Sequence, residues 1–295
     1  MAAVVRVPAT SANLGSGFDA LGLALALSAE VSVSLEPHDG NSHSLAPMVA
    51  AAARAAYRKA GQPEPAELRV AWNDTDPERP IPIARGLGAS AAARAAGIVA
   101  ANALMDAPLS DEELLSVGAE LEGHADNIAP ALFGGLQITV QNDGTWHRLR
   151  VPLASGLKIV LFVPDLEMPT RESRARLPQR LSREDAIFNV GRAAMLIAAL
   201  EQGKWELLDA ATQDRLHQDA RAEAFTALDD IIGAAMEAGA HGAYLSGGGS
   251  AIAAFTTDDE ERVARLMQQA AVARGFSGRS LITEPSATGA ELLES

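Results

Sequence analysis

Apolar and polar residues alternate along several short stretches of the chain, and this two-residue period is typical of a half-buried β-strand. The clearest case is residues 31–35, where Val31, Val33 and Leu35 alternate with two serines. Residues 157–163 are an unbroken apolar run, as in a strand buried on both faces. Strands are predicted at residues 4–7 (ended by Pro8), 21–27, 31–35, 68–72, 136–140, 146–151, 157–163 and 279–283, and on both sides of a glycine loop within 242–255.

Between these strands, apolar residues recur with the helical period of 3.6 residues. Ser110 and Glu113 have the spacing of a capping box, Ser182 begins another helix in a similar way, and Thr257 is expected to cap the last one. Helices are predicted at residues 48–60, 90–105, 110–122, 182–201, 205–220, 225–238 and 257–273. The mixture predicts an α+β protein with two lobes, whose boundary falls where the pattern changes near residues 152–156.

The composition excludes several functional classes. The 24 Lys and Arg residues against 38 Asp and Glu give a net charge of −14, which argues against a nucleic-acid-binding surface but not against a nucleotide pocket. The chain has no cysteine, so disulfides, thiolate metal sites and cysteine nucleophiles are excluded. The first residues lack the pattern of a secretory leader, and no apolar run is long enough to span a membrane. We therefore expect a cytoplasmic protein that does not bind membranes.

Residues 81–94 contain the strongest candidate for a ligand site. Gly86 and Gly88 can adopt positive φ and expose the backbone, Ser90 supplies a hydroxyl, and an alanine-rich helix follows. A helix N-terminus offers unpaired N–H groups and the positive end of a dipole, which favour a bound phosphate. These residues alone are also compatible with an ordinary loop-to-helix turn.

Other known motifs do not fit this sequence. The single Gly203-Lys204 pair has no partner glycine and is followed by Trp205, so there is no Walker A loop. Pro80 and Pro82 interrupt the strand that a dinucleotide-binding fingerprint requires. The chain also has no Gly-x-Ser-x-Gly nucleophile elbow, and its six histidines are too scattered for a zinc site.

Three glycine-rich segments and one His-Ala-Asp-Asn segment carry a resemblance to a known family. The segments are Asn13-Leu-Gly-Ser-Gly-Phe-Asp19, Arg85-Gly-Leu-Gly-Ala-Ser90, Leu245-Ser-Gly-Gly-Gly-Ser250 and Gly123-His-Ala-Asp-Asn127. Together they resemble the galactokinase, homoserine kinase, mevalonate kinase and phosphomevalonate kinase (GHMP) superfamily of small-molecule kinases. The residues from Val7 to Asp19 and from His124 to Gly135 are most similar to its homoserine kinase branch.

This resemblance implies a fold, a reaction and an assembly. The fold would be the two-lobed GHMP kinase fold, with a ribosomal-protein-like α/β lobe at residues 1–152 and a ferredoxin-like lobe at 153–295. The reaction would transfer the γ-phosphoryl group of ATP, with Mg²⁺, to the hydroxyl of L-homoserine in threonine biosynthesis. Two alternatives are a kinase for another small alcohol and an ATP-binding relative without activity. Family behaviour also implies a homodimer.

For the nucleotide and the metal ion, the resemblance assigns residues in the second glycine segment and the following helices. Ser90 would bind Mg²⁺ together with a carboxylate, for which Glu120 is favoured and Glu122 competes. Oxygen ligands of this kind suit Mg²⁺. The residues expected around the ATP phosphates are Ile83, Ala84, Arg85, Gly86, Leu87, Gly88, Ala89, Ser90, Ala91 and Ala92.

For the acceptor, the resemblance places residues from both lobes around an amino acid. Asn13, Asp19 and Asn127 would face the hydroxyl and amino ends, whereas Thr170, Arg174 and Arg221 would face the carboxylate, with Gly247 nearby. Arginine suits a carboxylate because it forms paired hydrogen bonds. Asn13, Asp126 and Asn127 are the candidate catalytic residues, with no evident general base. Arg171 and Arg176 are either surface charges or alternative carboxylate partners. Without the resemblance, Arg221 would be interpreted as a solvated helix residue, since arginine is usually exposed.

Overall fold

The computed structural model describes residues 2–37 and 43–294, and its first half is organised around an antiparallel sheet of six strands. The strand order is β10-β1-β2-β4-β5, and β3 pairs with β2 as well. The strands are β1 (Ala2–Ala12), β2 (Leu21–Ser34), β3 (Arg69–Asp74), β4 (Leu136–Asn142), β5 (Thr145–Val151) and β10 (Glu291–Glu294). The runs predicted at 21–27 and 31–35 therefore belong to one long strand, and β10 was not predicted.

The prediction that Pro8 ends the first strand is wrong. Pro8 is paired with Ser28 inside β1, and the register shifts between Pro8 and Ala9. β10 pairs only with residues Val4 to Arg6, so Pro8 does not interrupt a ladder on that side of β1. Proline is tolerated in a strand at such an irregularity because no hydrogen bond needs its missing N–H.

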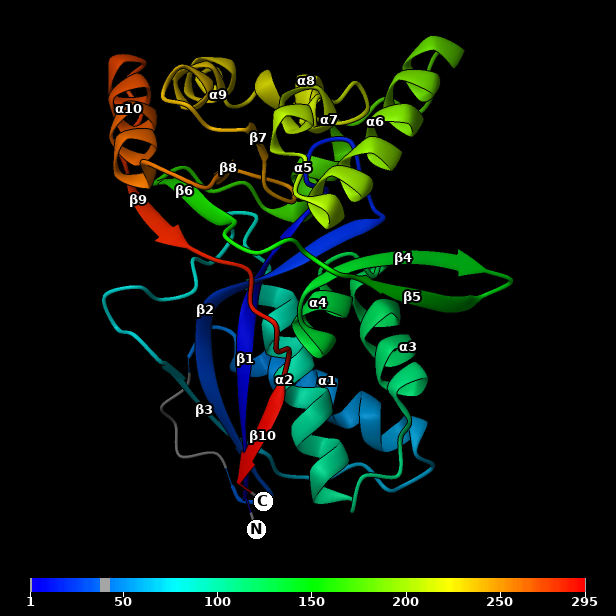
Figure 1. Ribbon diagram of the computed structural model, residues 1–295. Helices are drawn as coiled ribbons and strands as arrows, with labels where there is room; N and C mark the ends of the chain where they lie inside the picture. The colour runs from blue at the N-terminus through cyan, green and yellow to red at the C-terminus, as the bar shows by residue number, and fades with distance from the viewer. Residues whose placement is uncertain (1, 38–42, 295) are drawn as a thin grey trace.

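Four helices pack beside this sheet (Figure 1): α1 (Ala46–Lys59), α2 (Ala89–Leu104), α3 (Asp111–Glu122) and α4 (Ile128–Phe133). α2 lies close to α1, since a Cβ at Gly97 would be 2.2 Å from the carbonyl oxygen of Val49. The capping box predicted at Ser110 and Glu113 is confirmed, with both reciprocal hydrogen bonds present. The alanine-rich sequence of α2 thus allows a buried central helix that carries the second glycine segment at its N-terminus.

The second half contains a four-stranded antiparallel sheet in the order β7-β8-β6-β9. The strands are β6 (Lys158–Pro164), β7 (Gly242–Leu245), β8 (Ile252–Thr256) and β9 (Gly278–Thr283). Val160 and Phe162 on one face of β6 pack into a core with α9 (Leu228–Glu237) and α10 (Glu260–Ala273), which Figure 1 shows beside this sheet. Ile159 and Leu161, on the other face, join the core of the first sheet and its helices. This burial on both faces explains the unbroken apolar run predicted for the strand.

The remaining helices are α5 (Thr170–Ala175), α6 (Arg183–Gln202), the 3-10 turn η1 (Trp205–Leu207), α7 (Leu208–Thr212) and α8 (Gln218–Ala222). The helix predicted over residues 205–220 is therefore interrupted. Asp214 accepts hydrogen bonds from the backbone N–H groups of His217 and Gln218, both at 2.8 Å, and so begins α8 after a loop. The predicted cap at Thr257 is also wrong, because α10 follows Asp259 and has no side-chain cap.

The two halves of the chain share one apolar core, which contains residues of the first sheet together with one face of β6. β10 also returns from the end of the second half to pair with β1. In the described part of the chain, no helix is both long and apolar enough to cross a membrane.

Candidate active site

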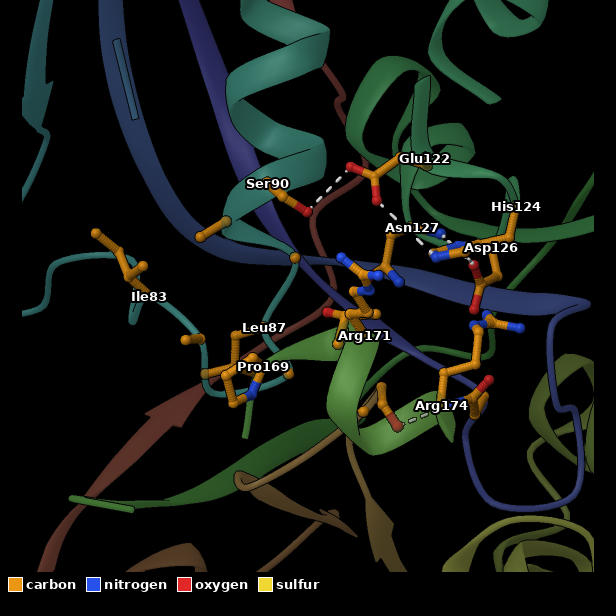
Figure 2. A pocket seen from close by; sticks show the side chains of 18 of the residues that line it. Ile83, Leu87, Ser90, Glu122, His124, Asp126, Asn127, Pro169, Arg171 and Arg174 are labelled. Carbon is orange, nitrogen blue, oxygen red and sulfur yellow. Dashed lines mark hydrogen bonds and ion pairs between the residues drawn. The ribbon is translucent and has the colours of Figure 1, made fainter. Parts of the chain in front are cut away.

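A cleft of about 520 Å³ opens between the two halves and gathers most of the predicted site residues. Its walls come from the first glycine segment, the N-terminus of α2, the α3–α4 connection, α5, α8 and the β7–β8 loop (Figure 2). The predicted residues that line it are Asn13, Asp19, Ile83, Ala84, Gly86, Leu87, Gly88, Ala89, Ser90, Glu122, Asp126, Asn127, Thr170, Arg174, Arg221 and Gly247.

The second glycine segment is held in place by contacts with the β7–β8 loop and with strand β1. Gly86 and Gly88 have φ of 74° and 66°, in the left-handed region that favours glycine. A Cβ at Gly86 would be 2.1 Å from the carbonyl oxygen of Ser246, and one at Gly88 would be 1.8 Å from Oγ1 of Thr10. These glycines are thus required for close contacts of the segment with the β7–β8 loop and with β1. The N-terminal turn of α2, with its free N–H groups, lies at the cleft as predicted.

Three residues of the predicted phosphate loop do not line the cleft. The guanidinium of Arg85 donates to the carbonyl oxygens of Pro164 and Asp165 at 2.7 and 2.8 Å, which anchors the loop to the end of β6. Ala91 and Ala92 are fully buried inside α2. Their side chains are therefore packing and anchoring groups rather than parts of the cleft wall.

Gly88 gives a direct test of this loop arrangement. We expect Gly88→Ala to lower the free energy of unfolding by about 2 kcal/mol or more, because it adds a steric clash to left-handed strain. If MgATP is the ligand, as the resemblance implies, displacement of Thr10, which donates to Asn127 at 2.8 Å, should also reduce kcat/KM for it more than tenfold. Thermal unfolding and steady-state kinetics measure both effects.

The control for this substitution is Gly144→Ala. Gly144 has a similar φ of 79°, and a Cβ added there would meet no atom within 4 Å, so alanine adds the strain without the clash. We expect about 1 kcal/mol of destabilisation and unchanged kinetics. Equal losses in the two variants would show that the contact with Thr10 is unimportant.

Ser90 and Glu122 form the candidate metal site. The Ser90 hydroxyl donates to a Glu122 carboxylate oxygen at 3.0 Å, as drawn in Figure 2, and Arg94 pairs with the same oxygen. Glu120, which the sequence favoured, is exposed and accepts a hydrogen bond from Ser116 at 2.9 Å. The two glutamates project from α3 in different directions, and only Glu122 lines the cleft. A hydroxyl and a carboxylate beside a helix N-terminus, which favours anions, fit the oxygen preference of Mg²⁺.

His124, Asp126 and Asn127 form a hydrogen-bonded group beside Glu122, whose Oε2 lies 3.9 Å from His124 Nε2 (Figure 2). His124 Nδ1 lies 2.5 Å from Asp126 Oδ1, which also accepts the backbone N–H of Asn127 at 3.1 Å. Burial lowers the pKa of His124, but the hydrogen bond and charge of Asp126 outweigh this, so the pKa is raised. Asp126 is thus engaged with His124 and with the backbone of Asn127, which suits an orienting role better than that of a free base.

Asp19 and Arg174 are paired with each other across the cleft. Both Nη atoms of Arg174 donate to the Asp19 carboxylate at 2.7 Å. Asn13 Oδ1 accepts the backbone N–H of Asp19 at 3.0 Å, and Asn13 Nδ2 donates to the carbonyl oxygen of Gly247 at 2.9 Å. A zwitterionic ligand carries the two opposite charges that would take the place of this ion pair. These residues come from both halves of the chain, as predicted.

Arg221 is a buried residue, so its interpretation as a solvated helix residue is wrong. Its exposed fraction is 2%, and Nη1 donates to His217 Nδ1 at 2.6 Å and to the carbonyl oxygen of Gly247 at 3.2 Å. Burial, with the nearby charge of Arg174, lowers the pKa of Arg221 to about 10. Its Nε is a buried donor without a hydrogen-bond partner among the described residues, as expected for a residue that binds an anionic ligand.

Comparison with known proteins identifies the family. Residues 47–135 match the GHMP kinases N terminal domain, and residues 196–273 match the GHMP kinases C terminal model. Homoserine kinase of Thermus thermophilus is 41% identical over 284 residues, which cover 94% of each chain. The chain belongs to the homoserine kinase family. Homoserine kinase of Caldicellulosiruptor bescii is 39% identical over 87% of this chain and 85% of that protein.

Solved structures agree with this membership of the homoserine kinase family. The crystal structure of homoserine kinase from Cytophaga hutchinsonii has a TM-score of 0.85 and 25% identity, and the match covers 99% of this chain and 97% of that one. Mevalonate kinase of L. major, at 15% identity and a TM-score of 0.65 over 95% of each chain, shares the fold. The predicted family and the two-lobed α+β GHMP kinase fold are confirmed.

Within this homoserine kinase family member, several residues of the cleft were missed or left open by the sequence. Arg171 points from α5 into the cleft (Figure 2), whereas Arg176 does not line it. Phe18 stacks on His217 with ring centroids 5.3 Å apart. The position of Phe18 inside the first glycine segment was the only sign in the sequence that this residue belongs to the site. The other lining residues without a predicted role are Leu45, Met48, Arg94, His124, Pro169 and Gly248.

Proposed function

We propose that this protein is a homoserine kinase, which transfers the γ-phosphoryl group of MgATP to the hydroxyl of L-homoserine and produces O-phospho-L-homoserine and ADP. One observation carries the proposal beyond family membership. A single cleft holds a phosphate-binding helix terminus together with Asp19, Arg174 and Arg221, a set of charges that complements a zwitterionic amino acid.

The nucleotide would bind along residues 83–90, with its phosphates at the N-terminus of α2. Ser90 and Glu122 would hold Mg²⁺, which neutralises phosphate charge in reactions of this class. Glu122 replaces Glu120 in this proposal because Glu122 alone contacts Ser90 and lines the cleft. The apolar side chains of Leu45, Met48 and Pro169, also in the cleft, provide a surface for the base.

The acceptor would bind on the opposite side of the cleft. Asp19 would pair with the ammonium group, and Arg174 and Arg221 with the carboxylate, with Thr170 and Gly247 beside them. Asn127 and Asn13 would position the hydroxyl. Its oxygen forms the new bond to the γ-phosphorus as the bond to the bridging oxygen of ADP breaks, and the hydroxyl proton is released. Positioning and charge neutralisation supply most of the catalysis in such a reaction, so Asp126 would orient Asn127 rather than act as the base.

An acceptor assay tests this function against its alternatives. The protein is supplied with MgATP and homoserine, mevalonate, galactose or no acceptor, and ADP formation is followed. Homoserine-dependent ADP release is expected, since mevalonate has a carboxylate but no ammonium group to pair with Asp19. Activity with another alcohol alone would assign a different GHMP kinase, and ATP binding without turnover would indicate an inactive relative.

We further propose a cytoplasmic homodimer that acts in threonine biosynthesis, with lobes at residues 1–152 and 153–295. Family behaviour supports the dimer and the pathway. The presence of two separate sheets supports the division into two lobes. With this boundary, β10 belongs to the second lobe by sequence but pairs with β1 in the sheet of the first lobe.

A further inference from the structure

The guanidinium of Arg221 is fixed along one edge by a buried histidine ring and by a backbone carbonyl of the β7–β8 loop. Nη1 makes both of its hydrogen bonds inside the protein, to His217 Nδ1 and to the carbonyl oxygen of Gly247. Nε remains a buried donor without a described partner. The orientation of Arg221 toward the cleft therefore depends on the groups that hold Nη1 in place.

His217 has the geometry of such a holder. The exposed fraction of this residue is 1%, and it does not line the cleft. Nδ1 must be unprotonated, because it lies 2.6 Å from an Nη1 atom that can only donate. The ring hydrogen is then on Nε2, which donates to the carbonyl oxygen of Gly15 at 2.9 Å. Burial lowers the pKa of His217 to about 4, in agreement with a neutral ring.

The surroundings of His217 connect it to both sides of the cleft. Asp214 accepts the backbone N–H of His217 at 2.8 Å, which fixes the start of α8. Phe18 stacks on the imidazole, and the guanidinium carbon of Arg221 is 5.7 Å from the centre of the Phe18 ring. The first glycine segment, the imidazole and the arginine are thus packed as one unit.

We propose that His217 is a positioning residue, which holds Arg221 through Nδ1 for the carboxylate of the acceptor and ties it through Nε2–H to the first glycine segment. This inference rests on the proposed function for the identity of the ligand that Arg221 binds. The proposal requires that the ring hydrogen of His217 is on Nε2. It also requires that the acceptor at Nδ1 matters more for the role of His217 than the size of the ring.

Two substitutions separate the two ring nitrogens. The amide oxygen of asparagine at 217 would lie near the position of Nδ1, so His217→Asn keeps an acceptor for Arg221. The amide nitrogen of glutamine would lie near Nε2, so His217→Gln keeps the donor to Gly15 but places no acceptor at Nδ1. Both variants lose the aromatic stacking on Phe18, so the comparison between them isolates the two ring-nitrogen contacts.

The test is steady-state kinetics of both variants with homoserine and MgATP. We expect His217→Gln to raise the KM for homoserine roughly tenfold, the size of one lost charge-assisted hydrogen bond. His217→Asn should remain within about threefold of the wild-type KM, and kcat and the KM for ATP should change little in either variant. Equal KM values in the two variants, or a joint decline of kcat and of affinity for both substrates, would show that the ring only fills space.

A second measurement keeps this inference distinct from the proposed function. Nitrogen-15 NMR of the histidine rings, with His217 assigned from the spectrum of His217→Gln, should show an unprotonated Nδ1 and a protonated Nε2. The opposite tautomer would overturn the inference whatever the enzyme phosphorylates. His241→Asn is the control, because this half-buried histidine is bonded to Thr257 away from the cleft and should leave the kinetics unchanged.

Discussion

Arg221→Ala is expected to raise the KM for homoserine by roughly a hundredfold and to leave the KM for ATP nearly unchanged. The substitution removes a buried charged donor on the acceptor side of the cleft, and hydrogen bonds to charged groups contribute about 1.5–3 kcal/mol each. A loss of about 3 kcal/mol corresponds to this change in KM.

The matched control for this prediction is Arg176→Ala. Arg176 is an exposed arginine that does not line the cleft, so its loss should leave both KM values within about twofold. Thermal unfolding of both variants shows whether the protein remains folded. If Arg221→Ala lowers the affinity for ATP instead, the acceptor and nucleotide sides of the cleft have been assigned the wrong way round.

Glu122→Gln is expected to reduce kcat at least about a hundredfold, whereas Glu120→Gln should have almost no effect. Glutamine keeps the size of the side chain but removes the negative charge that would bind Mg²⁺ beside Ser90. Loss of charge stabilisation in a transition state commonly reduces kcat by this factor. Glu120 is an exposed residue bonded to Ser116, so its charge lies outside the cleft.

The measurement is kcat at saturating ATP over a range of Mg²⁺ concentrations. A higher Mg²⁺ requirement in Glu122→Gln, with normal thermal stability, would support a metal ligand. Glu122 also pairs with Arg94, so a fall in stability alone would point to a structural ion pair. A larger loss in Glu120→Gln would restore the choice that the sequence favoured.

The elements of this fold were predictable wherever local pattern and tertiary environment agree. The unbroken apolar run at residues 157–163 is a strand because both of its faces are buried. The pattern could not show where tertiary contacts override local preference. Pro8 continues a strand because no partner needs its N–H. Asp214 interrupts a helical pattern because its side chain accepts a hydrogen bond from the backbone of His217, which ends the loop before α8.

The candidate site shows the same limit at the level of single residues. The glycine segments and the Asp-Asn pair were recognised because each is a compact motif, and the structure brings them to one cleft. The choice between Glu120 and Glu122 could not be made from spacing, since it depends on which side of α3 faces Ser90. Phe18 and His217 stack on each other only because the fold packs the first glycine segment against the start of α8. No pattern in the sequence shows that contact.

The core shared by the two halves of the chain has a consequence for how ligands enter. A hinge motion that separated the halves would expose Ile159 and Leu161 on the inner face of β6 to water, along with the residues that cover them. Because this is unfavourable, the halves should unfold together in one cooperative transition rather than as two independent units. Entry to the cleft would then rely on local movement of a short, exposed element such as α5, whose Arg174 must release Asp19 before a zwitterion can bind.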